Sequence, residues 1–266
     1  MSMMSWLRSI PGFTRFTGLA GSRPIPDALW LQTLQNHAFL QQLPADQQAR
    51  LRELSRDFLA HKEFSGAHGL QISDEMAVAI AAQACLPVLH LGLKLYDDFK
   101  GIVVHPAAML ARREVADAAG VVHRYSEALA GEAMQRGPVT LSWQDVAASG
   151  ESAERGHNVV IHEFVHKMDM RDGHANGCPP LPSRAAKAAW QTVMQQAYAS
   201  FRHQIVMAER FGAEPPWLDA YGAQSPVEFF AVAAEAYFVN RPQFETDFPE
   251  VALLFDSFFG PKSPPG

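Results

Sequence analysis

The segment HEFVH, residues 162–166, holds two histidines and a glutamate in the spacing of a metal-binding helix. Residues four apart lie one turn apart on the same face of an α-helix, so His162 and His166 present two imidazoles about 6 Å apart. Both can bind one zinc ion, which leaves positions for a third ligand and a water. Glu163 lies at the edge of the same face, where it can accept a proton from that water. The pattern predicts a zinc centre with Glu163 as the general base.

The residues around this segment favour a buried metal site over an exposed polar stripe. A five-residue pattern with three fixed positions also arises by chance, and a His-x-x-x-His pair is often a surface feature. Here, however, the histidines interrupt an apolar helix face made by Val160, Ile161, Phe164, Val165 and Met168. Polar groups are costly to bury without partners, and zinc is such a partner.

A third protein ligand is needed, and three acidic residues downstream are candidates. Asp169 lies on the same helix as the histidines, so it fits better as an acceptor for an imidazole N–H or as a helix-end residue than as a ligand. Glu228 and Glu235 lie seven apart on a later predicted helix, hence on one face, and either can reach the metal. Glu228 also completes a capping-box pattern that begins at Ser225. The residues alone leave the two glutamates equal.

The elements that position these residues indicate an α+β fold. Three short runs bounded by Gly or Pro, at 101–106, 120–125 and 138–143, predict the strands of one small sheet. The apolar periodicity and the capping residues predict helices at about 27–43, 44–59, 73–87, 153–170, 183–211, 225–240 and 249–259.

Composition narrows the class of function. The net charge is −6 and no Lys/Arg run is present, which argues against direct nucleic-acid binding. No stretch approaches the roughly 20 apolar residues of a membrane span, and the start lacks the pattern of a signal peptide. Cys85 and Cys178 are too few for a disulfide framework and are not spaced as a zinc pair, so we expect free thiols. These features predict a cytoplasmic protein.

Long stretches around the motif resemble one known family. HEFVHKMDMRDG (162–173) and DAYGAQSPVEFFAVAAEAYF (219–238) are similar to the Mlc titration factor A family of zinc metallopeptidases. The similarity extends through SGAHGLQISDE, AAQACLPVL, REVADAAGVVHRY and GPVTLSW, and thus over most of the chain from about residue 65. The resemblance implies a gluzincin-like catalytic domain similar to that of anthrax lethal factor, with the third ligand on a later helix.

Carried onto this sequence, the resemblance assigns the remaining site residues. It makes Glu228 the third zinc ligand and places Glu235 near a metal-bound histidine. It also makes Tyr221, seven residues before Glu228, the group that polarises the scissile carbonyl or stabilises the oxyanion. Residues 138–143 are either an edge strand that pairs with extended substrate or a plain core strand. Other histidines are expected to be structural or surface groups, including His68, His105, His123, His157 and His174.

These expectations define the domains and the function. We expect a flexible arm at 1–26, a helical N-terminal part at 27–98, a zinc metallopeptidase domain at 99–260 and a tail at 261–266. The predicted activity is hydrolysis of a peptide or protein substrate by a metal-bound water that Glu163 activates, with one Zn²⁺ per chain and aminopeptidase action as one option. Because the family is named for titrating the Mlc transcription repressor, the resemblance also implies binding to an Mlc-like repressor. The alternative is a protein-binding anti-repressor whose zinc site is structural or only weakly catalytic.

Overall fold

A five-stranded sheet packs against the helix that carries the HEFVH segment, and its strands lie in the order β1-β2-β3-β7-β6. The computed structural model describes residues 14–15, 24–116, 122–129 and 131–261. The parallel strands are β2 (Glu63–Gly66), β3 (Gly101–His105) and β7 (Val139–Ser142), and the antiparallel strands at the two ends are β1 (Thr14–Arg15) and β6 (Gly131–Ala133). The order makes β7 an interior strand. The strand that ends the sheet beside the HEFVH helix is therefore β6, and not the segment 138–143.

The strands differ from the prediction in two further ways. The segment 120–125 was expected in the same sheet, but β5 (Val122–Leu129) pairs with β4 (Met109–Ala116) as a separate hairpin, while 120 and 121 lie outside the described residues. Local strand preference identifies a strand but does not fix its partner. Strand β2 lies in the part predicted to be helical. It was not predicted, because its four residues are too few to give a clear alternating pattern. Most of the predicted arm, and the tail after residue 261, lie outside the described residues.

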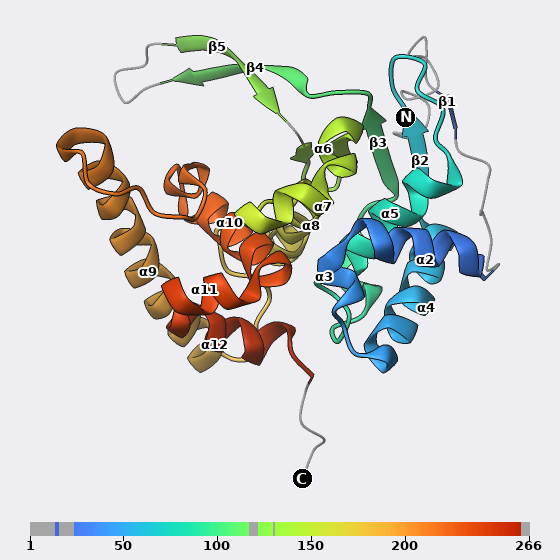
Figure 1. The fold of residues 1–266 in the computed structure, drawn as a ribbon. Coiled ribbons are helices and arrows are strands. Elements are labelled where there is room, and N and C mark those ends of the chain that lie inside the picture. Colours follow the sequence, from blue (N-terminus) through green and yellow to red (C-terminus); the bar gives the residue numbers. More distant parts are fainter. Residues whose placement is uncertain (1–13, 16–23, 117–121, 130, 262–266) are drawn as a thin grey trace.

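Helices account for most of the remaining chain (Figure 1). They are α2 (Asp27–Asn36), α3 (Ala38–Gln41), α4 (Ala45–His61), α5 (Asp74–Cys85), α6 (Trp143–Ala147), α7 (Ser149–Ser152), α8 (Val159–Asp169), α9 (Arg184–Phe211), α10 (Pro226–Val239), α11 (Arg241–Asp247) and α12 (Pro249–Phe259). Short 3-10 turns are η1 (Leu93–Tyr96), η2 (Ala153–Arg155), η3 (Met170–Asp172) and η4 (Ala220–Ala223). The predicted helices that begin at Ser73, Ser183 and Ser225 are confirmed, and each serine hydroxyl accepts a backbone N–H of the first turn.

Two predicted helices are shorter than their apolar patterns indicate. The helix expected at 27–43 is divided at His37, where the backbone leaves the helical region and the ring bonds to the Thr33 carbonyl at 2.8 Å. The helix expected at 153–170 begins as the turn η2, which ends at Gly156 in the left-handed conformation with φ 78°. A left-handed glycine terminates a helix, and α8 therefore starts only at Val159.

One aromatic cluster anchors α8 in the hydrophobic core. Phe164 lies with its ring centroid 5.5 Å from that of Phe58, 5.1 Å from Tyr96 and 5.9 Å from Phe99. The N-terminal part thus shares one core with α8. The domain boundary between residues 98 and 99 stays a prediction. Both cysteines are buried and free. Within the described ranges, no helix has the length and apolar character needed to cross a membrane.

Candidate metal centre

Helix α8 begins at a capped asparagine that ties it to two other helices. The Asn158 side chain accepts the backbone N–H of Ile161 at 2.9 Å, as an N-cap does. Its amide nitrogen donates to Gln83 of α5 at 2.8 Å, and its backbone N–H donates to Glu235 of α10. The start of α8, and with it the rotation of the helix, is fixed by contacts from distant parts of the chain.

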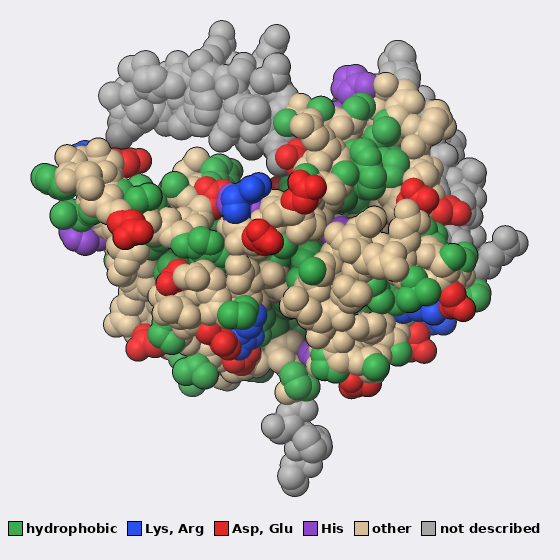
Figure 2. Space-filling model, in the orientation of Figure 1, with side chains coloured by type: hydrophobic (Ala, Val, Ile, Leu, Met, Phe, Trp, Pro, Cys, Tyr) green, Lys and Arg blue, Asp and Glu red, His purple; other side chains and the backbone are tan. Residues whose placement is uncertain are grey.

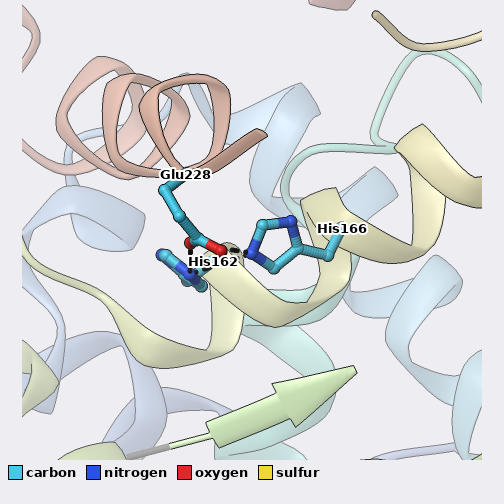
Figure 3. Close-up of side chains that lie close together, drawn as sticks. All are labelled: His162, His166 and Glu228. Carbon is cyan, nitrogen blue, oxygen red and sulfur yellow. Dashed lines mark hydrogen bonds and ion pairs between the residues drawn. The ribbon is translucent and has the colours of Figure 1, made fainter. Parts of the chain in front are cut away.

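Three side chains from α8 and α10 converge on one point (Figure 3). His162 Nε2 lies 3.0 Å from His166 Nε2, and Glu228 Oε2 lies 3.1 Å from the first nitrogen and 3.2 Å from the second. Glu228 is the residue that the family resemblance assigns as third ligand. Its backbone N–H bonds to Ser225 Oγ, as the capping pattern predicts, while its carboxylate points to the histidines.

The three atoms fit a zinc ion in spacing and in charge. At bond lengths of about 2.0–2.1 Å, tetrahedral ligand atoms lie about 3.3–3.4 Å apart, close to the separations found here. Since His162 Nδ1 faces the Glu235 carboxylate at 2.6 Å, the neutral ring carries its proton there and offers a lone pair at Nε2. That lone pair faces the Glu228 carboxylate, and two such acceptors repel unless a positive charge lies between them. Burial lowers the pKa of His162, but Glu235 and Glu228 raise it well above its ordinary value, so the site attracts positive charge.

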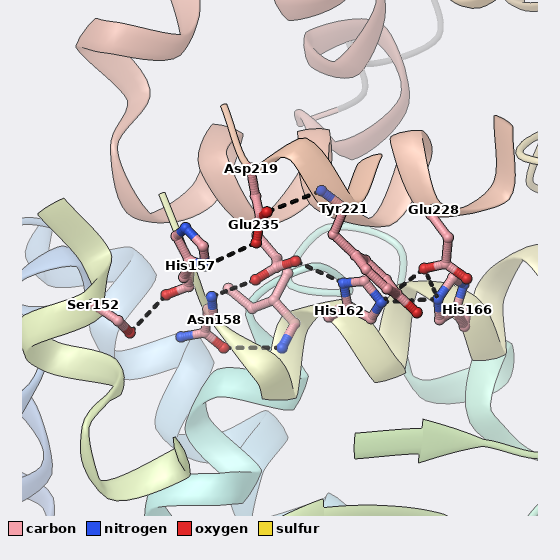
Figure 4. A network of polar contacts seen from close by, with 10 residues as sticks. Ser152, His157, Asn158, His162, His166, Asp219, Tyr221, Glu228 and Glu235 are labelled. Atoms are coloured by element: carbon pink, nitrogen blue, oxygen red, sulfur yellow. Dashed lines mark hydrogen bonds and ion pairs between the residues drawn. The ribbon is translucent and has the colours of Figure 1, made fainter. Parts of the chain in front are cut away.

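The two glutamates that the sequence leaves equal lie on opposite sides of His162 (Figure 4). Glu228 approaches Nε2, whereas Glu235 accepts from Nδ1 with one oxygen and from the Asn158 backbone with the other. Burial raises the pKa of Glu228, but hydrogen bonds with His162 and His166 hold it well below its usual range. The Glu235 position is that of a group that orients a metal-binding histidine.

Glu163 is almost fully enclosed beside the converging atoms. Its side chain is 4% exposed, and Oε2 has no hydrogen-bond partner among the described residues. Burial raises the pKa of the carboxyl to about 7, although His162 and His166 act in the opposite direction. A carboxyl with a pKa near neutrality is suited to accept and return a proton.

Asp169 lies at the last position of α8 and holds the loop that follows. Its carboxylate accepts the backbone N–H groups of Asn176, Gly177 and Cys178 at 2.7 to 3.0 Å. Asp169 was predicted to be either an acceptor for an imidazole N–H or a helix-end residue, and these backbone contacts are those of a helix-end residue. His166 Nδ1 has no hydrogen-bond partner among the described residues, so Asp169 does not accept from that imidazole.

Tyr221, Asp219 and His157 form the other side of the site, and of the three only Tyr221 was predicted to belong to it (Figure 4). The Tyr221 ring centroid lies 5.9 Å from that of His162, and its backbone N–H donates to Asp219 at 2.9 Å. Asp219 also lies 3.2 Å from His157 Nδ1, which the sequence analysis treats as a structural or surface group. The pair joins the loop before α8 to the loop before α10. Only the local Asp-x-Tyr turn pattern could have drawn attention to Asp219.

These residues border a cleft of about 570 Å³. Its lining includes Gly131, Asp145, Arg155, His157, His162, Glu163, Asp219, Tyr221 and Glu235. Figure 2 shows basic and acidic side chains next to one another over α7 and α10. A cleft of this size, lined by His162 of the converging set and by the buried Glu163 carboxylate, has the chemistry of a hydrolytic site.

Comparison with known proteins identifies the family. The profile of the family described as glucose-regulated metallo-peptidase M90 matches residues 14–260. The chain therefore belongs to this metallopeptidase family, and membership implies a metal ion. Its relatives include Mlc titration factor A of Yersinia pestis (strain Pestoides F), which is 34% identical over 233 residues, or 87% of this chain and 84% of that protein. Mlc titration factor A of Yersinia pseudotuberculosis serotype O:1b (strain IP 31758) matches to the same extent. The resemblance predicted from the sequence is confirmed.

Proposed function

We propose that this chain is a zinc-dependent peptidase that hydrolyses peptide bonds in the cleft beside α8, with Glu163 as the general base. The observation that supports this best is the convergence of His162, His166 and Glu228 next to the buried carboxylate of Glu163, which lies on α8 with the two histidines. Membership of a metallopeptidase family agrees with it. The two free cysteines agree with a reducing, cytoplasmic location.

Each residue of the centre has a separate task in this proposal. His162 and His166 would hold the ion through Nε2, and Glu228 through Oε2. A zinc ion bound there supplies a Lewis acid and acidifies a water molecule. Glu235 keeps the proton of His162 on Nδ1 and fixes the ring orientation. Glu163 takes a proton from the attacking water and returns it to the leaving amine.

Tyr221 is proposed to donate a hydrogen bond from its phenol to the carbonyl oxygen under attack. We expect Tyr221→Phe to lower kcat by about 10²–10³-fold, because one donor to the developing oxyanion is lost. Zinc content should not change. Tyr198→Phe is the matched control, since Tyr198 bonds to the Ala223 carbonyl and does not border the cleft. Steady-state kinetics that give Tyr221→Phe the kcat of wild type would remove Tyr221 from the mechanism.

An extended substrate is proposed to lie along β6 and not along β7. Strand β6 is at the end of the sheet, and Gly131 on it approaches the Glu163 side chain. A peptide that adds to this edge would place its backbone over the general base. Gly131 of this strand also lines the cleft, which agrees with a substrate position along β6.

A defined peptide mixture incubated with the zinc-loaded protein tests the activity. Mass spectrometry should show products that appear with zinc and disappear with a chelator. Stepwise loss of single N-terminal residues would identify an aminopeptidase, and internal cuts an endopeptidase. If the protein holds one zinc per chain and yields no products, the peptidase proposal is wrong.

The names of the relatives favour a second function. Proteins 34% identical to this chain are called Mlc titration factor A, so we infer that this chain also binds an Mlc-like transcription repressor. The net charge of −6 suits a partner that is itself built to bind DNA. A pull-down with purified repressor tests this. Binding that survives His166→Ala would be independent of the metal, and absence of binding by wild type would contradict the inference. Repressor binding without peptide hydrolysis would favour the anti-repressor alternative.

A further inference from the structure

Lys167 follows His166 directly and is fully buried. Its Nζ donates to the backbone carbonyls of Met134 at 2.8 Å and Gly137 at 3.2 Å. It also lies 4.4 Å from the centroid of the Phe99 ring. An ammonium group is costly to remove from water, and these contacts offset part of that cost.

Both carbonyls belong to the turn that joins β6 to β7. The Gly137 N–H bonds to the Met134 carbonyl at 2.9 Å and closes this turn. Lys167 therefore ties the β6–β7 turn to α8, the helix that bears both histidines. Because Lys167 and Glu163 are four residues apart, they lie one turn apart on the same side of α8.

At its other end, β6 meets Glu163 itself. A Cβ atom placed on Gly131 would lie 2.6 Å from both Cγ and Oε1 of Glu163, so a side chain at this position would displace the Glu163 carboxylate. With Oε2 of Glu163 unbonded among the described residues, packing against Gly131 restricts the carboxylate. Strand β6 thus contacts α8 at Glu163, and the turn that follows β6 contacts α8 one helix turn further on, at Lys167.

We propose that Lys167 is a positioning residue that holds β6 against α8, so that Gly131 fixes the Glu163 carboxylate and β6 borders the cleft at the distance that catalysis requires. The inference rests on the proposed peptidase function, because it assigns Lys167 a role in that same site. Displacements of about 1 Å in a catalytic site can lower rates by about 100-fold.

The test compares Lys167→Met with Lys62→Met. Lys62 is a matched control because its Nζ donates to two backbone carbonyls, of Tyr96 and Phe99, and lies 3.9 Å from the same Phe99 ring. Its contacts do not involve the β6–β7 turn. Methionine keeps the unbranched apolar stem of either lysine and is only one heavy atom shorter. Both variants lose an ammonium group that donates to two backbone carbonyls, so both should be less stable in thermal unfolding.

We expect Lys167→Met to keep one zinc per chain and to lose about 10- to 100-fold in kcat, with a smaller change in KM. Lys62→Met should keep the kcat of wild type. Amide hydrogen exchange should become faster over residues 131–142 in Lys167→Met only. Equal kcat in the two variants would show that Lys167 has no positioning role, and unchanged exchange over 131–142 would show that it does not hold β6 to α8; either result would overturn the inference.

Gly131→Ala tests the same contact between β6 and Glu163 from the other side. If Lys167→Met does not fold, Gly131→Ala takes its place; it should retain zinc and lose kcat to a similar extent, and an unchanged kcat would overturn the inference. An inactive wild type would contradict the peptidase proposal instead. The hydrogen-exchange comparison would then decide whether Lys167 holds β6 to α8.

Discussion

Glu163→Gln is expected to lower kcat for peptide hydrolysis by about 10²–10⁴-fold, the range typical of a lost general base. The amide has nearly the shape of the carboxylate, so it fits the space beside Gly131, but it cannot accept a proton from water. Zinc content should stay at one per chain, because Glu163 is not one of the three proposed ligands. Metal analysis and steady-state kinetics on the same preparation measure both quantities.

The control for this change is Glu151→Gln on α7, which removes one negative charge at an exposed position. It should keep the kcat of wild type. Retention of activity in Glu163→Gln would show that another group accepts the proton. Loss of zinc together with activity would make Glu163 a metal ligand instead of a base.

The second large effect concerns the two glutamates of α10. Glu228→Ala should abolish stoichiometric zinc binding and, with it, activity, because it removes one of the three proposed protein ligands. Glu235→Ala should weaken zinc affinity only about 10- to 100-fold, since it removes the partner that orients His162. Competition against a fluorescent zinc chelator measures both affinities. The reverse order, with the weaker binding in Glu235→Ala, would contradict the ligand assignment.

The histidine pair could be predicted because its geometry is local. A helix of period 3.6 places His162 and His166 on one face whatever surrounds it, and apolar neighbours indicated that the face is buried. Serine caps fixed the starts of α5, α9 and α10 for the same reason. Such features depend on a few consecutive residues.

The rest of the site depends on how α8 and α10 meet. Glu228 and Glu235 share a face of α10, so only the position of α10 along α8 decides which of them reaches Nε2 of His162. That position follows from contacts such as Asn158 with Glu235, which join residues 77 positions apart. The spacing of residues in the sequence therefore does not predict the position of α10 along α8.

Strand β6 shows the same limit at the edge of the cleft. Three residues, Gly131–Ala133, are too few for a recognisable strand pattern, and the longer run at 138–143 drew the prediction instead. The roles of Gly131 and Lys167 become visible only when the turn between β6 and β7 lies against α8.

Titration of zinc into the chelator-treated protein, with peptide hydrolysis as the signal, tests the catalytic metal centre most directly. Hydrolysis should be absent without metal, rise in proportion to added zinc and reach its plateau at one ion per chain. Hydrolysis that persists in the metal-free protein, or that stays absent after one zinc ion has bound per chain, would contradict a catalytic role for the centre formed by His162, His166 and Glu228.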